Sequence, residues 1–276
     1  MGMRIATNVT AINATRNLTT SQRIMATSSA QLSSGYRINK SADDAAGLAI
    51  SENMKSQIRS SVQARRNAND GISLVQTAEG GLGEISNIIT RLRELGIQAA
   101  SDTVGERERI LINVETQQLK GEIERIAQTT AWNTTKLLDG STPLFDFQVG
   151  TFATENDVIS FDSSVNLSTL EGLNLANVDY TQKEGARASL NQLDEAQSNV
   201  NGMRANLGAL QNRLTSTVDT LAVAEENISA ANSRIRDTDV AASSSEMARN
   251  QVLLQAGTAT LAQANQSNQL ALKLIG

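Results

Sequence analysis

The sequence predicts a mainly α protein: an elongated antiparallel helical bundle or coiled coil with one small β-hairpin, its N- and C-terminal segments paired. Three observations predict this fold class. Every seventh residue from Leu193 to Ile228 is aliphatic, which is the spacing of a coiled-coil helix. The 276 residues contain one Pro and 3% aromatic residues, so almost the whole chain is free to be helical. Strand-like alternation is confined to one stretch, which holds all four Phe.

The aliphatic repeat predicts a long helix from about residue 186 to 235. We call its seven-residue repeat the rod seam: Leu193, Val200, Leu207, Leu214, Leu221 and Ile228. A sustained repeat of this kind requires a partner helix along the same length. At 1.5 Å per residue the helix would be roughly 75 Å long, too long for the core of a compact globule.

The two ends of the chain carry thinner apolar repeats. Near the N-terminus they are Leu18, Met25 and Leu32, and near the C-terminus Met247, Leu254 and Leu261, with Leu270 following. Many of the residues between them are Asn, Thr and Ser, which are mediocre helix formers, mixed with Ala and Gln. Neither segment is expected to be a stable helix alone, so we expect the ends to pair with each other or with neighbouring copies.

Along the whole chain, the two ends included, we expect five segments. They are an N-terminal helix in 1–40, helices in 41–135, a β-hairpin element in 136–180, the long C-terminal helix in 181–236 and a terminal helix in 237–276.

Local signals refine these segments. Ser41 and Asp44 resemble a capping box, with Ser41 as the N-cap of the helix that follows. Three glycines at residues 80, 81 and 83 favour a bend in that helix, and a further helix is expected from about Glu106 to Thr130. Residues 144–149 and 158–161 are expected to be the two strands, in an element with its own aromatic core.

Composition excludes several classes of function. The sequence has neither Cys nor His, which removes disulfides, thiolate chemistry, the commonest general base and the commonest metal ligand. We therefore expect no catalytic residues, no metal site and no cofactor. A net charge of -5, with Arg mixed among Glu, argues against nucleic-acid binding. No apolar run reaches about 18 residues, so no membrane insertion is expected.

Three tracts resemble one protein family. They are residues 32–51, beginning Leu-Ser-Ser-Gly-Tyr-Arg-Ile-Asn; residues 91–99; and residues 233–266, with Ser-Arg-Ile-Arg-Asp-Thr-Asp at the start. Together they are similar to the end signatures of bacterial flagellins, over about residues 3–140 and 182–275. Tyr36 is a departure, because Leu is common there. The resemblance implies a flagellar filament subunit whose terminal helices line a hollow tube, surrounded by a helical rod domain with a β-hairpin. The roughly 40 residues between the two halves leave no large outer domain.

The resemblance also implies partners and a location. The chain would polymerise with itself, meet the flagellar cap and hook-junction proteins, and carry an export chaperone on its C-terminal helix. It would be secreted into the filament by the flagellar type III apparatus without a cleaved signal peptide. Arg91, Leu95 and Glu115 fall where this family is contacted by Toll-like receptor 5. Their other interpretation is packing against adjacent filament subunits.

Two other functions stay open at this point. A hook–filament junction protein shares these end signatures but usually has more material in the middle of the chain. A type III secreted effector would need an active or receptor-binding domain, for which the β element is small.

Overall fold

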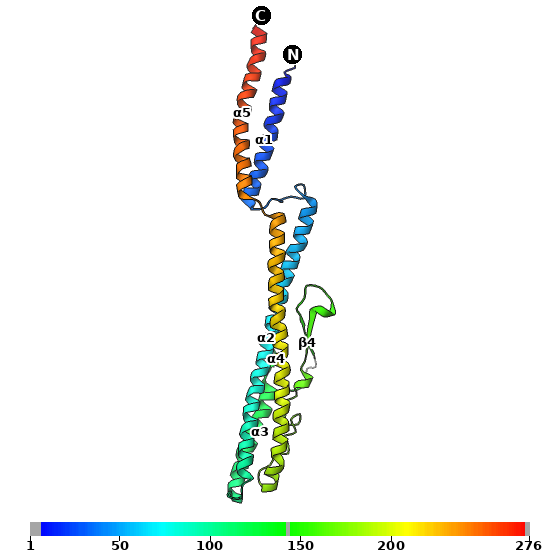
Figure 1. Cartoon of the computed structure of the whole chain (residues 1–276), viewed down its shortest axis with the longest axis vertical. Coiled ribbons are helices and arrows are strands. Elements are labelled where there is room, and N and C mark those ends of the chain that lie inside the picture. Colours follow the sequence, from blue (N-terminus) through cyan, green and yellow to red (C-terminus); the bar gives the residue numbers. More distant parts are fainter. Residues whose placement is uncertain (1–6, 142–143, 274–276) are drawn as a thin grey trace. The chain divides into compact units, whose positions relative to one another are not determined.

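The computed structural model describes residues 7–141 and 144–273, with side-chain surroundings as far as residue 266. Pro143 and the side chain of Leu270 lie outside that part. Five helices dominate (Figure 1): α1 (Val9–Ser34), α2 (Ala45–Ala99), α3 (Glu106–Thr129), α4 (Lys183–Arg236) and α5 (Val240–Lys273). The predicted mainly α fold with a small antiparallel hairpin is confirmed. The chain divides into two units, residues 58–226 and residues 1–57 with 227–276.

The unit of residues 58–226 has a continuous apolar core. α2, α3 and α4 run side by side there (Figure 1), and the core of α2 recurs at heptad spacing, with Val75, Leu82 and Ile89 all buried. The rod seam meets this core: Leu193, Val200, Leu207 and Leu214 are fully buried, whereas Leu221 is half-buried. α2 is a single unbroken helix from Ala45 to Ala99, so its three glycines do not end it.

The turn between α2 and α3 closes on an arginine. Arg109 Nε donates to the carbonyl of Ala99 at 2.9 Å, and its Nη2 donates to the carbonyl of Ser101 at 3.0 Å. These bonds satisfy the carbonyl of Ala99 at the end of α2 and that of Ser101 in the turn after it. The turn between α2 and α3 is therefore closed by a side chain of α3.

The hairpin is formed by β3 (Leu144–Gln148) and β4 (Val158–Asp162), with Phe145 opposite Phe161. These two rings stack with centroids 6.1 Å apart. Ile159 and Phe161 are buried in the main core, so the hairpin shares that core instead of having its own. Phe152, at the tip, is 62% exposed and is not part of any aromatic core. A second small hairpin, β1 (Ala131–Trp132) with β2 (Thr135–Lys136), was not expected from the sequence.

The segment that leads from the hairpin to α4 is held on α3 by its backbone. Glu124 Oε2 accepts from the amide of Leu170 at 3.0 Å, and Asn113 Oδ1 accepts from the amide of Tyr180 at 3.1 Å. Between them Lys120 Nζ donates to the carbonyls of Ala176 and Val178. An irregular segment needs such partners, because buried backbone groups must be hydrogen-bonded.

The start of α2 corrects one expectation. Asp44, not Ser41, is the N-cap residue: its Oδ1 accepts from the amide of Gly47 at 2.8 Å, and α2 begins at Ala45. Asp43 instead folds the preceding turn, where its Oδ2 accepts from the amides of Asn39 and Lys40. These two backbone bonds lower the pKa of Asp43. The two adjacent carboxylates therefore hold the turn and the first residues of α2, and the cap lies three residues later than expected.

Candidate assembly interface

α1 and α5 form an antiparallel pair that brings the described ends of the chain together (Figure 1). Asn8 links them, since its Nδ2 donates to the carbonyl of Ala264 at 2.9 Å. Further along the pair, Gly257 lies against Leu18, so that an added Cβ would be 3.4 Å from the leucine side chain. The weak helices expected at the two ends therefore pack on each other within one chain.

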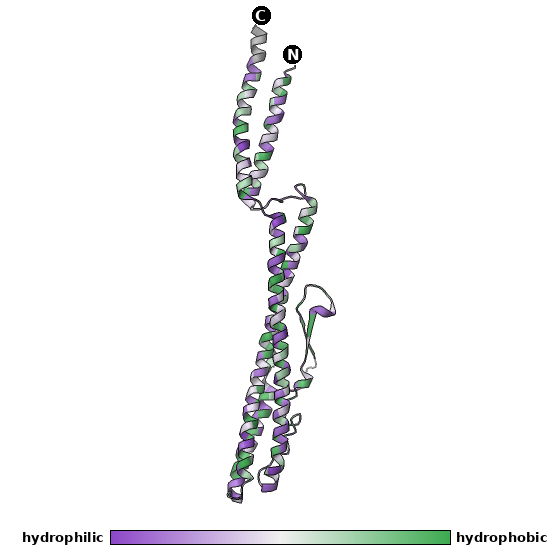
Figure 2. Cartoon of the chain, viewed as in Figure 1, coloured by the Kyte–Doolittle hydropathy of each residue, from purple (hydrophilic) through white to green (hydrophobic). Residues whose placement is uncertain are grey.

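This pair has no apolar core of its own. Among the described side chains of α1 and α5, the buried ones are polar: Ser28, Ser243 and Asn250. Large apolar side chains lie in solvent, with Val9 56%, Val252 63% and Leu253 50% exposed. Figure 2 shows apolar and polar residues interspersed along α1 and the coloured part of α5. Two helices of this composition bury too little apolar surface together to be stable unaided.

The predicted polymerisation residues lie along this pair. Leu18, Met25, Leu32, Met247, Leu254 and Leu261 are all half-buried, neither in a core nor fully in solvent. Half-burial leaves part of each side chain available to a further helix. Sequence spacing found these positions, but it did not identify the more exposed Val252 and Leu253, because they lie off the seven-residue repeat.

The two connectors at the base of the pair are tied together. The amide of Arg37 donates to the carbonyl of Arg236 at 2.7 Å, and the amide of Thr238 donates to the carbonyl of Gly35 at 3.0 Å. The guanidinium of Arg236 lies 4.8 Å from the ring centroid of Tyr36, a cation–π contact. Tyr36, where the sequence departs from the resembled family, is therefore part of this junction.

The predicted contact residues on α2 and α3 fall into two environments. Arg91 bridges the helices: its Nη1 donates to Glu94 at 3.0 Å and its Nη2 donates to Glu115 at 2.9 Å. Bonds to Glu94 first, and then to Glu115, raise the pKa of Arg91. Leu95 is only 2% exposed and belongs to the core, so it does not share a surface with Arg91 and Glu115. What lies beside this ion pair on α3 is an exposed apolar group, Leu111 and Val114.

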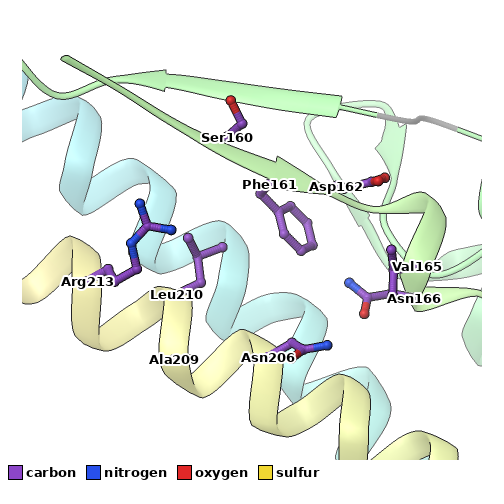
Figure 3. A pocket seen from close by; sticks show the side chains of 9 residues that line it. All are labelled: Ser160, Phe161, Asp162, Val165, Asn166, Asn206, Ala209, Leu210 and Arg213. Carbon is purple, nitrogen blue, oxygen red and sulfur yellow. The ribbon is translucent and has the colours of Figure 1, made fainter. Parts of the chain in front are cut away.

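An open pocket of about 270 Å³ lies between the hairpin and α4 (Figure 3). Phe161 and Leu210 point toward each other across it, and Arg213 extends from α4 at one edge (Figure 3). Asp162, the carboxylate that lines the pocket, already accepts hydrogen bonds from the amide and hydroxyl of Ser164. The described part of the chain contains no cluster of potential metal ligands. The pocket therefore offers no nucleophile–base pair or metal site.

Two buried polar residues were missed by sequence reasoning. Lys120 is 6% exposed, and desolvation lowers its pKa while Asp179 opposes that effect. Tyr180 is fully buried and burial raises the pKa of its hydroxyl, which donates to the carbonyl of Leu92. A Lys within an apolar heptad and a lone Tyr gave no periodic signal.

In the described residues no helix is both long and apolar enough to span a bilayer.

Terminal helices that pair with each other and expose apolar side chains, in a chain that also has a helical unit with its own apolar core, are typical of a structural subunit that assembles with other copies. Comparison with known proteins gives the family. The model of the bacterial flagellin N-terminal helical region matches residues 5–142, and that of the C-terminal helical region matches residues 190–275. The chain belongs to the bacterial flagellins, and it is a structural subunit that polymerises into the flagellar filament.

Individual relatives agree with this assignment. The chain is 46% identical to the flagellin of Halalkalibacterium halodurans over 274 residues, covering 99% of this chain and 100% of that one. It is 39% identical to the flagellin of Bacillus subtilis, again covering 99% and 100%. The crystal structure of Bacillus cereus flagellin aligns with a TM-score of 0.50 and 27% identity, over 56% of this chain and 88% of that chain. Only residues 143–189 lie between the matched regions, so there is no large outer domain there.

Proposed function

We propose that α1 and α5 are the polymerisation domain and that neighbouring subunits supply the apolar partner surface these helices lack. The observation that carries this proposal is that the buried side chains of the pair are polar while Val252 and Leu253 are half or more exposed. In a filament the same side chains would be buried against equivalent helices of other copies. Each Å² of apolar surface buried in this way contributes ~25 cal/mol, and the gain requires assembly.

In this proposal the helix pair lines the inside of the filament and residues 41–236 form the rod around it. The proposed boundaries at residues 40 and 236 lie near the connectors around Gly35 and Thr238, whereas the compact units divide within α2 and α4, after residues 57 and 226. The rod has its own apolar core. The chain performs no catalysis, which agrees with the absence of His and Cys in the sequence.

The partners follow from the same surfaces. An export chaperone would cover α5 before assembly, because Val252 and Leu253 are apolar and exposed on it. Secretion as an unfolded chain without a cleaved signal peptide, and contacts with the cap and hook-junction proteins, complete the proposed route to the filament.

We also propose Arg91 and Glu115 as contacts to adjacent subunits, or to Toll-like receptor 5 in free monomer. Their ion pair is half exposed and the neighbouring Leu111 and Val114 are exposed, which supports an external contact. Leu95 would act only indirectly, by holding α2 in the core. A reporter-cell assay with purified monomer tests the receptor contact, and no response would exclude it.

Truncation tests the polymerisation domain. We expect the chain without about 30 residues from either end to keep a folded rod, seen as cooperative unfolding followed by Trp132 fluorescence. Seeded with fragments of full-length filament, it should form no tubes by negative-stain microscopy. The full chain under the same conditions should assemble, with a rise in helicity by circular dichroism. Filaments built by either truncated chain would contradict the proposal.

A further inference from the structure

The rod seam cannot by itself fix how far α4 is displaced along α2. Its residues recur every seven positions and are all aliphatic, from Leu193 to Ile228. The facing core of α2 repeats in the same way, with Val75, Leu82 and Ile89 seven apart and buried. If α4 moved by seven residues, aliphatic side chains would again meet aliphatic side chains. A second feature is needed to distinguish one displacement from the next.

A line of polar side chains beside the seam bridges the same two helices. We call these residues the polar line: Arg65, Glu79, Ser86 and Arg93 on α2, and Asp194, Gln197, Arg204 and Glu225 on α4. Gln197 Nε2 donates to Ser86 Oγ at 2.7 Å, and Arg93 Nε donates to Asp194 at 2.7 Å. Arg65 pairs with Glu225 at 3.2 Å, and Arg204 with Glu79 at 3.5 Å.

The polar line has the same period as the seam but not the same uniformity. Its α2 members are multiples of seven residues apart, so they occupy one heptad position, while the identities change from Arg to Glu to Ser to Arg. On α4 the corresponding position carries Gln197, Arg204 and Glu225. A repeating position with changing charge contains the positional information that the aliphatic seam lacks.

We propose that the polar line sets the register between α2 and α4. Moving α4 by seven residues in one direction puts Glu79 opposite Gln211 and Arg93 opposite Asn201. Moving it in the other direction puts Glu79 opposite Gln197 and Arg93 opposite Arg187, a pair of like charges. The three ion pairs of the polar line are lost in either case.

The native register is thus favoured because the pairs of the polar line form together in it and are lost in the shifted registers. It does not depend on the strength of any one pair. The ion pairs are partly exposed, and such pairs individually contribute little to stability. Three atoms of the line, Gln197 Oε1, Arg204 Nε and Glu225 Oε2, are buried without a hydrogen-bond partner among the described residues, although Glu225 Oε2 lies 3.2 Å from Arg65 Nη1. Burying a polar atom without a hydrogen-bond partner lowers stability, but such groups can specify one arrangement of helices over another.

Two other contacts could set the register: the hydroxyl of Tyr180, which anchors the segment before α4 to Leu92 of α2, and the ion pair between Arg236 of α4 and Glu52 of α2. An experiment must separate the polar line from these contacts. Because the sequence has no Cys, spin labels can be attached at Asn87→Cys on α2 and Thr215→Cys on α4, both exposed. A slip of seven residues moves one label by about 10 Å along the helix axis. Double electron–electron resonance on dilute full-length monomer measures that distance without any filament.

The test variant neutralises the three ion pairs of the polar line and keeps the Arg236–Glu52 pair: Arg65→Gln, Glu79→Gln, Arg93→Gln, Asp194→Asn, Arg204→Gln and Glu225→Gln. The matched control neutralises three pairs within single segments: Glu122→Gln with Arg125→Gln, Lys136→Gln with Asp139→Asn, and Glu184→Gln with Arg187→Gln. Circular dichroism and Trp132 fluorescence establish that each variant is folded. We expect a second distance, displaced by about 10 Å, in the test variant and a single distance in the control.

Charge exchange provides a variant that keeps the number of charges. Glu79→Arg alone places two Arg side chains together and should produce the displaced distance, and adding Arg204→Glu should remove it. A single, unchanged distance in both the neutral variant and Glu79→Arg would overturn the proposal and leave Tyr180 or the Arg236–Glu52 pair as the determinant. The displaced distance appearing in Tyr180→Phe with the polar line intact would overturn it too.

Discussion

The hydroxyl of Tyr180 donates to the carbonyl of Leu92 at 2.8 Å, in the interior of the helical unit. Gly96 makes room for it, since a Cβ at that position would be 3.0 Å from the tyrosine oxygen. One turn of α2 therefore supplies both the acceptor and the space. This contact joins the segment before α4 to α2, and burial keeps the hydroxyl protonated by raising its pKa.

Replacing Tyr180 with Phe tests this contact. We expect a loss of about 1 kcal/mol in the free energy of unfolding, because the bond is removed while the ring remains. Urea denaturation followed by Trp132 fluorescence measures the loss. Gly96→Ala should lower the free energy of unfolding less in the Tyr180→Phe chain than in the original chain. The tyrosine oxygen, which is the nearest atom to the new methyl group, is then absent. Equal costs in the two backgrounds would show that the two positions do not interact.

The buried amine of Lys120 gives a pH dependence of known sign. Desolvation lowers its pKa in the folded chain, so between that pKa and the ordinary value of 10.5 the unfolded chain binds more protons. Stability contributed by this group therefore rises with pH through that window and is complete above 10.5. We expect the free energy of unfolding of the original chain, minus that of Lys120→Met, to increase from neutral pH towards pH 10.5. A difference that falls over this range would contradict the assignment.

The helices and the main hairpin could be predicted because their signals are periodic and local. Seven-residue spacing from Leu193 onward identified α4, and alternation around Phe145 identified β3. The burial of Leu95 is indicated by the apolar repeat that runs through Ile89 and Leu92, and this repeat conflicts with its expected role as a surface contact beside Arg91. Lys120 and Tyr180 bind backbone carbonyls of segments distant in sequence, and no local pattern indicates such partners. The partner surface of α1 and α5 was inferred from weak propensity, which indicates a missing partner but not the exposed residues that would meet it.

The cap of α2 depends on one carboxylate. Asp44→Ala removes the acceptor of the Gly47 amide, and we expect a loss of about 1 kcal/mol in the unfolding free energy. Asp44→Asn and Asp44→Ser, which keep an acceptor oxygen, should recover most of it. Ser41→Ala is the matched control and should have little effect, because in the structure Ser41 does not cap the helix. The reverse order, with Ser41→Ala costing more, would restore the capping box expected from the sequence.

A single charge on α5 distinguishes assembly from folding. Leu261 is half-buried beside α1, so Leu261→Asp would place a carboxylate in a surface that becomes fully buried when neighbouring helices pack on it. Burial of an unpaired charge costs several kcal/mol, and each 1.4 kcal/mol is about a tenfold change in binding. We expect the monomer concentration required for assembly to rise at least tenfold, or assembly to be lost, measured by sedimentation of seeded filaments.

Gln263→Asp, at an exposed position two residues away, adds the same charge and should change that concentration much less. Unfolding of residues 58–226, followed by Trp132 fluorescence, should be unchanged in both variants, because the charge lies outside that unit. Equal effects of the two substitutions on assembly would mean that added charge, and not burial at Leu261, is responsible.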